Sequence, residues 1–259
     1  MATTYPILLV HGIMLKDTAF FKAFGHIESI LRQHGYTVFT APTDGFGTIE
    51  TNALQLKRYI LRVLKKTGAD RVNLIAHSKG GLDSRYMIDH LGMSDKVASV
   101  TFLCTPHYGS QVATKIYALP RPVKRLISAV LDMVYHTFGG DCHPNSLEVC
   151  RQLSHTPEGV LEHFHHDGIF MQSYSTAMEN SRDDFVMGIP WLCSRHWERD
   201  VSDGLVSQSS SRYAEYRGHC TEEPLSHSQI VDFMVRKNKK NAVYAFYLSL
   251  CRELEKREL

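Results

Sequence analysis

The sequence predicts an α/β fold with a mostly parallel central sheet and helices on both faces. Strand-like and helix-like segments alternate through the first hundred residues, which is the order that produces a parallel sheet. The strand-like segments are almost wholly apolar, as expected for parallel strands that are buried on both sides. A length of 259 residues suits one large domain, so we expect residues 1–259 to form a single unit.

The individual elements are predicted from the spacing of apolar residues. Short apolar runs indicate strands, and apolar residues three or four positions apart indicate helices. Gly35 and Gly68 each follow a helical segment, where a terminal glycine is common. The expected strands are 5–10, 36–41, 71–76, 97–104 and 169–174, and the expected helices are 18–34, 49–66, 80–91, 228–237 and 241–255.

Residues 111–147 interrupt this alternation and predict a helical insertion. Pro120 and Pro122 separate two helical stretches, and apolar residues then recur at helical spacing as far as Tyr135. The opposite side of this second helix is polar. The insertion is either a fixed cover or a moving lid, and both alternatives stay open. Its apolar stripe would equally suit transient contact with a lipid surface.

The strongest chemical signal is the segment 72–81, VNLIAHSKGG. An apolar strand leads into Ser78, and a helix follows. Ala76 and Gly80, two positions to either side, are small, as required where strand and helix backbones approach closely at a nucleophile elbow. The alternative reading is a serine that only caps the helix. We expect Ser78 to be a nucleophile.

A serine hydroxyl needs a base, and the base needs an orienting acid. On this topology the expected chain order is serine, acid, histidine. Asp203, followed by glycine, is predicted to be a loop carboxylate just past a strand, with Asp200 as its rival. His227 precedes an apolar helix-like run and is favoured over His219, which lies in a polar turn.

Acyl transfer also requires donors for the developing oxyanion. The backbone N–H of Lys79, the residue after the nucleophile, is the first candidate. The second is the N–H of Ile13, in the loop after the opening strand, where Gly12 lets the backbone turn toward the site.

Together these stretches resemble the bacterial true lipases of the α/β-hydrolase fold, the Pseudomonas and Proteus type of triacylglycerol lipase. The similar blocks are YPILLVHGIM at 5–14, VNLIAHSKGGLDSRY at 72–86, TPHYGS at 105–110, SDGLV at 202–206, SHS at 226–228 and, more weakly, NSLE at 145–148. The resemblance implies a triad of Ser78, Asp203 and His227 with Ile13 and Lys79 at the oxyanion hole. It also implies that 111–147 is a lid or cap within one α/β-hydrolase domain.

The same resemblance implies a structural Ca²⁺ near the catalytic histidine. Its ligands in the family are an aspartate two residues after that histidine and another upstream of the acid. Here Gln229 stands at the first of these positions, and Asp183 or Asp184 is the candidate for the second. One anionic ligand is therefore missing from a site type that depends on carboxylate oxygens.

Histidines are numerous, and several crowd one part of the chain, which raises the question of a Zn²⁺ site. They are His136, His143, His155, His163, His165 and His166. No Cys or Asp joins them at a finger-like spacing. Leu161 and Phe164 instead indicate an amphipathic helix carrying solvated histidines.

Composition excludes several classes of protein. A net charge of +2 argues against a nucleic-acid partner, which a basic stripe would accompany. The sequence has no run of 18 apolar residues, so no transmembrane segment is expected. No signal peptide is present, so a cytoplasmic protein or a mature secreted form is expected. Six scattered cysteines predict free, buried thiols.

We therefore expect a serine carboxylester hydrolase, a lipase or esterase that cleaves acylglycerols or other fatty-acyl esters. Its chemistry requires no cofactor. An acyltransferase that uses the same triad is the alternative, because an alcohol in place of water would resolve the same acyl-enzyme. A third reading, a non-catalytic module that binds a partner or metal through the histidine-rich region, requires an idle triad.

Overall fold

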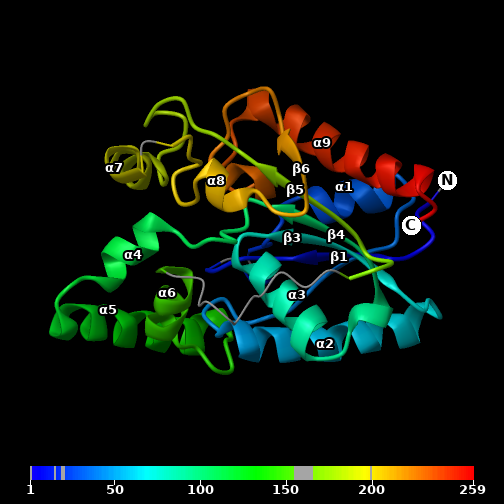
Figure 1. Ribbon diagram of the computed structural model, residues 1–259, viewed down its shortest axis with the longest axis horizontal. Coiled ribbons are helices and arrows are strands. Elements are labelled where there is room, and N and C mark those ends of the chain that lie inside the picture. The colour runs from blue at the N-terminus through cyan, green and yellow to red at the C-terminus, as the bar shows by residue number, and fades with distance from the viewer. Residues whose placement is uncertain (1, 15, 19–20, 155–165, 199) are drawn as a thin grey trace.

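The computed structural model describes residues 2–14, 16–18, 21–154, 166–198 and 200–259. Within these residues, one six-stranded sheet runs through the centre of the molecule in the order β2-β1-β3-β4-β5-β6 (Figure 1). Each neighbouring pair of strands is parallel. The strands are β1 (Ile7–Val10), β2 (Val38–Thr40), β3 (Val72–His77), β4 (Val97–Leu103), β5 (Phe170–Ser175) and β6 (Glu215–His219).

Helices cover both faces of this sheet, as the sequence predicts. Helices α1 (Ile27–Gln33) and α9 (Lys237–Lys256) lie on one face, and α2 (Ile49–Thr67) and α3 (Lys79–His90) lie on the other (Figure 1). Alternate residues of β1 belong to the two cores: Ile7 and Leu9 pack toward α1 and α9, whereas Leu8 and Val10 pack toward α2 and α3. The α/β fold class is therefore confirmed.

A group of helices extends beyond one end of the sheet, opposite the two chain ends (Figure 1). Between β4 and β5 the chain forms α4 (Gln111–Tyr117), α5 (Arg121–Val134), a π-helical turn η2 (Tyr135–Gly139) and α6 (Ser146–Ser154). The apolar stripe of α5 is largely unpacked, and the Leu126 side chain is 68% exposed. Helix α7 (Gly188–Glu198) lies at the same end of the molecule. This end is therefore unusually apolar.

Several short elements were not expected. They are α6, α7, α8 (Gln208–Ser211), the 3₁₀ turn η1 (Ser94–Lys96) and the edge strand β6. Strand β6 shows no fully buried residue, so it lacks the apolar run by which β1, β3 and β4 are recognised.

The expected helix 18–34 was wrong at its start, because α1 begins only at Ile27. Side chains close a turn before it: Asp17 accepts a hydrogen bond from the N–H of Ala23, and Thr18 accepts one from the N–H of Phe21. Gly25 then adopts a positive φ of 47°. A left-handed residue cannot belong to a right-handed helix, so the helix starts after it.

The expected helix 228–237 was also wrong. The chain forms only the 3₁₀ turn Gln229–Val231, which ends at Asp232 with a φ of 62°. The Asp232 carboxylate accepts hydrogen bonds from the N–H of His26 and the hydroxyl of Tyr244. These contacts to α1 and α9 hold Asp232 in a conformation that stops the helix.

The six cysteines are all free, as expected, but not all are buried. Cys104, Cys220 and Cys251 are buried, whereas Cys142 is exposed. Among the described residues, no helix is both long enough and apolar enough to cross a membrane.

Candidate active site

Ser78 lies at the tight turn between β3 and α3. Its φ of 55° is uncommon for a residue with a Cβ and marks a strained backbone. A Cβ added at Gly80 would lie 2.4 Å from the carbonyl oxygen of His11, and one at Gly81 would lie 2.1 Å from Oγ1 of Thr105. The first turn of α3 thus packs directly on neighbouring segments, which explains why small residues follow Ser78.

The structure brings the three candidate triad residues together in one line of hydrogen bonds. The Nε2 atom of His227 lies 2.8 Å from Oγ of Ser78, and its Nδ1 lies 2.7 Å from Oδ2 of Asp203. All three side chains are buried. This is the order of contacts that lets a histidine accept the serine proton while a carboxylate holds the ring in the required tautomer.

Backbone groups fix the orientation of the Asp203 carboxylate. Its Oδ1 accepts hydrogen bonds from the N–H groups of Leu205 and Val206, at 3.0 and 2.8 Å, which leaves Oδ2 for the imidazole. The N–H of His227 in turn donates to the Asp203 carbonyl. The expectation that Asp203 follows a strand was wrong: it lies in a loop after α7, closed by a single bridge between Ser202 and Ser207.

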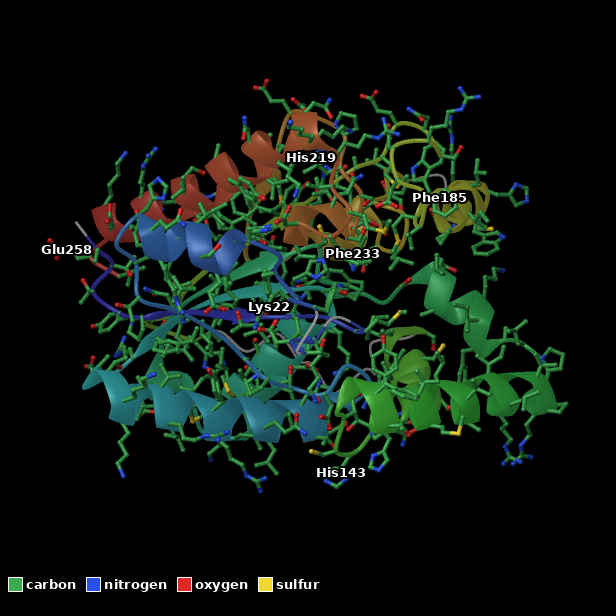
Figure 2. The ribbon with its side chains drawn as sticks, turned by 180° about the vertical axis from the view of Figure 1, so that it is seen from behind. Lys22, His143, Phe185, His219, Phe233 and Glu258 are labelled. Carbon is green, nitrogen blue, oxygen red and sulfur yellow. The ribbon has the colours of Figure 1, made fainter. Side chains whose placement is uncertain are left out.

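The rival residues lie elsewhere. The Asp200 carboxylate accepts hydrogen bonds from the N–H groups of Val201 and Ser209. His219 is the exposed last residue of β6, rather than part of a turn, and lies on the α9 side of the molecule (Figure 2). It is His227 that bonds to Oγ of Ser78, and Asp203 that bonds to the His227 ring.

His77 contacts the triad histidine, and sequence analysis did not single it out. Its Nε2 donates a hydrogen bond of 2.9 Å to the carbonyl oxygen of His227, and the two rings lie 4.6 Å apart. Burial, followed by repulsion from the His227 charge, holds the pKa of His77 well below its usual range. A neutral His77 can therefore anchor the His227 backbone without opposing an imidazolium at that residue.

The segments that carry the two candidate oxyanion donors lie next to the nucleophile. A Cβ on Gly12 would lie 2.6 Å from Cβ of Ser78, so only glycine lets the loop that contains Ile13 come this close. The side chain of Lys79 is buried and its ammonium pairs with Asp83 at 2.7 Å. Burial raises the pKa of Asp83 to about 6 despite this partner. The Lys79 ammonium is thus held by Asp83, and the backbone N–H of Lys79 is the group expected to donate to the oxyanion.

Two apolar hollows meet at Ser78 and His227. The first lies among α4, α5 and α6 and includes Ile127, Leu131 and Val149. The second also includes Ser78 and His227 but is otherwise lined mostly by other segments. Its apolar residues include Phe21, Val134, Phe138, Val186 and Phe233. An ester held at Ser78 therefore has apolar surface in two neighbouring hollows.

The zinc hypothesis receives no support from the described histidines. His166 Nε2 bonds to Asp89, and His136 Nδ1 bonds to the carbonyl oxygen of Asp141. The expected helix with Leu161 and Phe164, and with it His155, His163 and His165, lies outside the described residues. Within the described chain, a group with suitable ligand atoms is Cys104 with Asp203 and His227, of which the last two already bond each other.

Protein hydrogen bonds join the residues at the calcium position that the resemblance implies. The Gln229 amide donates from Nε2 to the Asp183 carbonyl and accepts at Oε1 from the N–H of Ser226. The Asp184 carboxylate receives donors from Val186 N, Met187 N, Ser226 Oγ and Ser228 Oγ, and the Asp183 carboxylate from Glu179 N, Asn180 N and Asn180 Nδ2. Although burial opposes it, these donors lower the pKa of Asp184.

Ca²⁺ takes six to eight oxygen ligands with free lone pairs. Carboxylates that already accept several N–H and O–H donors do not fit that requirement. In this chain, hydrogen bonds join the loop after Asp183 to the loop that carries His227, at the position where the resemblance implies a cation.

We therefore expect calcium to have no effect on stability. Addition of millimolar Ca²⁺, or of EDTA, should move the melting temperature by less than about 1 °C, because only a ligand that binds the folded state raises it. Gln229→Ala should lower the melting temperature by about 2–5 °C, since it removes two buried hydrogen bonds. A melting temperature that rises steadily with Ca²⁺ concentration would contradict this assignment.

Comparisons with known proteins agree with this geometry. Residues 5–127 match a family model described as the alpha/beta hydrolase fold. A triacylglycerol lipase of Pseudarthrobacter phenanthrenivorans is 39% identical over an alignment of 145 residues, and the match covers 53% of this chain and 44% of that lipase. Triacylglycerol lipase 2 of Saccharomyces cerevisiae is 28% identical over an alignment of 227 residues, and the match covers 82% of this chain and 62% of that protein.

The fold as a whole is similar to that of solved lipases. The Staphylococcus hyicus lipase has a TM-score of 0.74 at 15% identity, covering 98% of this chain and 97% of that one. This likeness concerns the fold. The chain spans less than two thirds of the length of the two curated lipases above.

Proposed function

Because this chain has the α/β-hydrolase fold, we propose that it is a serine carboxylester hydrolase that cleaves fatty-acyl esters through an acyl-enzyme on Ser78. The observation that carries the proposal is the buried line of hydrogen bonds from Ser78 through His227 to Asp203. Ser78 and His227 both line two apolar hollows. The same activity in curated relatives, which are triacylglycerol lipases, supports it.

The reaction uses only groups of this chain and a water molecule. Oγ of Ser78 attacks the ester carbonyl while Nε2 of His227 accepts the hydroxyl proton. The N–H groups of Ile13 and Lys79 donate to the oxyanion that forms. His227 then gives its proton to the leaving alkoxide, and Asp203 stabilises the imidazolium throughout. Water, deprotonated by His227, finally attacks the acyl-serine and releases the fatty acid.

The hollow among α4, α5 and α6 is the proposed acyl site. Its lining is dominated by aliphatic side chains, including Ile116, Leu147 and Leu153, which suit a hydrocarbon chain. The leaving alcohol would lie in the second hollow. Residues 111–147 form the wall of the acyl site, and we assign them as a lid or cap within a single domain of residues 1–259.

The exposed apolar side chains at this end suit transient contact with a lipid surface. Leu126, Val130 and Met133 of α5 face outward, and Phe185, before α7, is 94% exposed at the same end (Figure 2). Lys115, Arg121, Lys124 and Arg125 lie in the same insertion, where residues 111–131 contain no Asp or Glu. Apolar side chains next to cationic ones are the composition that binds lipid interfaces.

A substrate series tests this proposal. Hydrolysis of p-nitrophenyl esters from acetate to palmitate, and of emulsified triacylglycerol, should be measured for the wild type beside Ser78→Ala. We expect activity on long chains and on the emulsion. Activity confined to short esters would make the chain an esterase and the insertion a fixed cover, and wild-type activity equal to that of Ser78→Ala would refute the proposal.

The interface contact is tested by changing only outward-facing residues. In the double variant Leu126→Gln/Val130→Gln, emulsion hydrolysis should fall about tenfold, because less apolar area enters the lipid. Hydrolysis of soluble p-nitrophenyl butyrate should stay unchanged, since neither residue lines the acyl site. Leu61→Gln, an exposed apolar residue of α2, is the matched control. An equal loss on both substrates would place these residues in substrate binding instead.

A further inference from the structure

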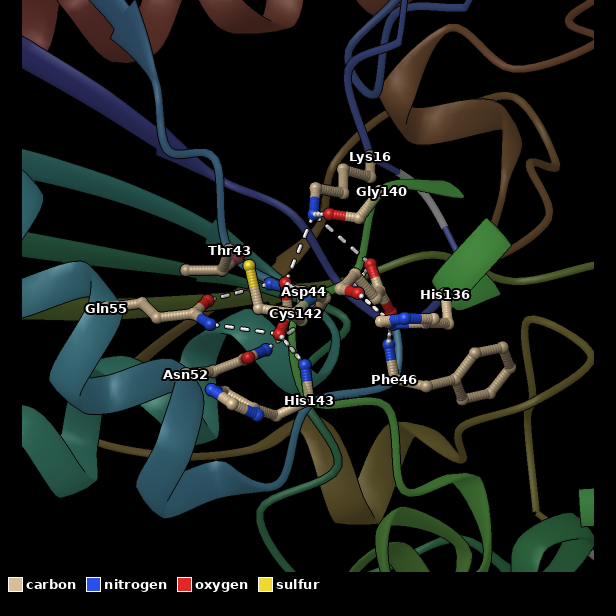
Figure 3. Close-up of polar contacts among 12 residues, drawn as sticks. Lys16, Thr43, Asp44, Phe46, Asn52, Gln55, His136, Gly140, Cys142 and His143 are labelled. Atoms are coloured by element: carbon tan, nitrogen blue, oxygen red, sulfur yellow. Dashed lines mark hydrogen bonds and ion pairs between the residues drawn. The ribbon is translucent and has the colours of Figure 1, made fainter. Parts of the chain in front are cut away.

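A buried cluster of charged residues lies beside the loop that supplies Ile13 and is not part of the triad. Nζ of Lys16 lies 3.1 Å from Oδ1 of Asp44 and 3.3 Å from Oδ1 of Asp141 (Figure 3). The Lys16 side chain is 11% exposed, and the two carboxylates are 2% and 0% exposed. The three residues come from the loop after β1, the loop after β2 and the loop before α6.

The two carboxylates each bind the backbone of the other's loop. Asp44 accepts hydrogen bonds from the N–H groups of Cys142 and His143, both at 3.0 Å (Figure 3). Asp141 accepts hydrogen bonds from the N–H groups of Gly45 and Phe46, at 2.9 and 2.8 Å. This reciprocal arrangement joins residues 44–46 and 140–143 into one unit.

These joined loops form several hydrogen bonds with the loop after β1, which contains Ile13. Nζ of Lys16 also donates to the carbonyl oxygen of Gly140 at 2.7 Å. The N–H of Met14 donates to the carbonyl oxygen of Gly45, and the hydroxyl of Tyr135 donates to the carbonyl oxygen of Met14 at 3.1 Å. Both contacts lie one residue from Ile13. The end of the 111–147 insertion is thus fastened to the segment that positions the second oxyanion donor.

Net stability alone does not account for this arrangement. One ammonium faces two carboxylates, and removing three charges from water costs free energy that their attraction only partly returns. Backbone donors and the Gln55 amide complete the shell. Burial works against ionisation of Asp44, but these hydrogen bonds lower its pKa overall. What such a cluster fixes firmly is the relative position of the segments that it joins.

We propose that Lys16, Asp44, Asp141 and Tyr135 are positioning residues that set the oxyanion hole by fastening the end of the insertion to the loop containing Ile13. The inference rests on the proposed hydrolase function and adds to it. In this proposal the 111–147 insertion positions the N–H of Ile13. The same segment that lines the acyl site therefore also aligns a donor that stabilises the transition state.

Two substitutions test this without touching the triad. Tyr135→Phe keeps the ring, which lies edge-on to Phe46 at 4.6 Å, and removes only the hydroxyl. Lys16→Met removes the ammonium and keeps most of the chain length. Lys22→Met is the matched control, because Lys22 pairs with Asp17 on the surface of the same region. Tyr59→Phe, on α2, is the control for loss of a hydroxyl.

With p-nitrophenyl butyrate, kcat should fall about fivefold in Tyr135→Phe and about tenfold or more in Lys16→Met, while KM stays within about twofold. Loss of a whole oxyanion donor costs about 10²–10³ in kcat, so a displaced donor should cost less. Affinity for an alkylboronic acid, whose tetrahedral adduct on Ser78 occupies the same hole, should fall in parallel. Lys16→Arg should recover part of kcat, and both controls should match the wild type.

Unchanged kcat and boronic-acid affinity in Tyr135→Phe would overturn the inference, even if Lys16→Met fails to fold. A raised KM at unchanged kcat in either variant would also overturn it, because the residues would then act in substrate binding. A wild-type protein no more active than Ser78→Ala would instead refute the hydrolase function itself, so the two failures are distinguishable.

Discussion

Ser78→Ala is expected to lower kcat for p-nitrophenyl butyrate by about 10⁴- to 10⁶-fold, because no other group can form the acyl-enzyme. The remaining rate reflects substrate binding and the oxyanion donors alone. The substitution removes one oxygen atom and keeps the Cβ, which lies so close to the Gly12 backbone that a Cβ added at Gly12 would be 2.6 Å away from it. The fold should therefore persist, and the strained φ at this position is as accessible to alanine as to serine.

The measurement combines kinetics with direct labelling. A fluorophosphonate should add once to the wild type, at the peptide that contains Ser78, and should not add to the variant. Thermal unfolding should occur within a few degrees of the wild type, about 2–4 °C per kcal/mol for a chain of this size. A folded variant that retains wild-type turnover would exclude Ser78 as the nucleophile.

Asp203→Asn is the second large effect, and its cause lies in the hydrogen bonds of the carboxylate. Two backbone N–H groups, from Leu205 and Val206, donate to Oδ1, so the asparagine must present its oxygen to them. Its NH₂ group then faces Nδ1 of His227. Nδ1 can only accept from this group, which moves the ring proton to Nε2, where the base must be free. We expect kcat to fall about 10⁴-fold.

Asp200→Asn provides the matched control for this prediction. Asp200 lies in the same loop region, and its carboxylate also accepts backbone N–H groups, but it does not contact His227. Its kcat should remain within about twofold of the wild type, since surface changes of this kind are usually small in effect. If Asp200→Asn lost activity and Asp203→Asn kept it, the assignment of the acid would be reversed.

Much of the fold could be predicted because parallel strands buried on both faces leave continuous apolar runs. Strands β1, β3 and β4 have no exposed residue, and each was found within about two residues. The Ser78 turn was found because its steric demand for small neighbours acts over a few residues of sequence. Asp203 and His227 were expected from chain order and from the residues around them, and the structure places these two side chains in contact.

The features that sequence analysis missed depend on contacts between distant segments. Helix α1 starts late because of side-chain turns at Asp17 and Thr18, and the segment after His227 stops early because Asp232 is held by two other helices. Strand β6 carries no apolar pattern because it lies at the sheet edge. The Lys16 cluster joins residues 28 and 125 positions apart, a separation at which local patterns carry no information.

The distance along the chain between nucleophile and base has a consequence for synthesis. Ser78 and His227 are 149 residues apart, and chains are elongated at about 5–20 residues per second. A nascent chain therefore carries the serine for about 7–30 s before its histidine has been made. A serine hydroxyl without a base is a poor nucleophile, so each newly made molecule stays inert toward esters until the C-terminal part has been translated and has docked.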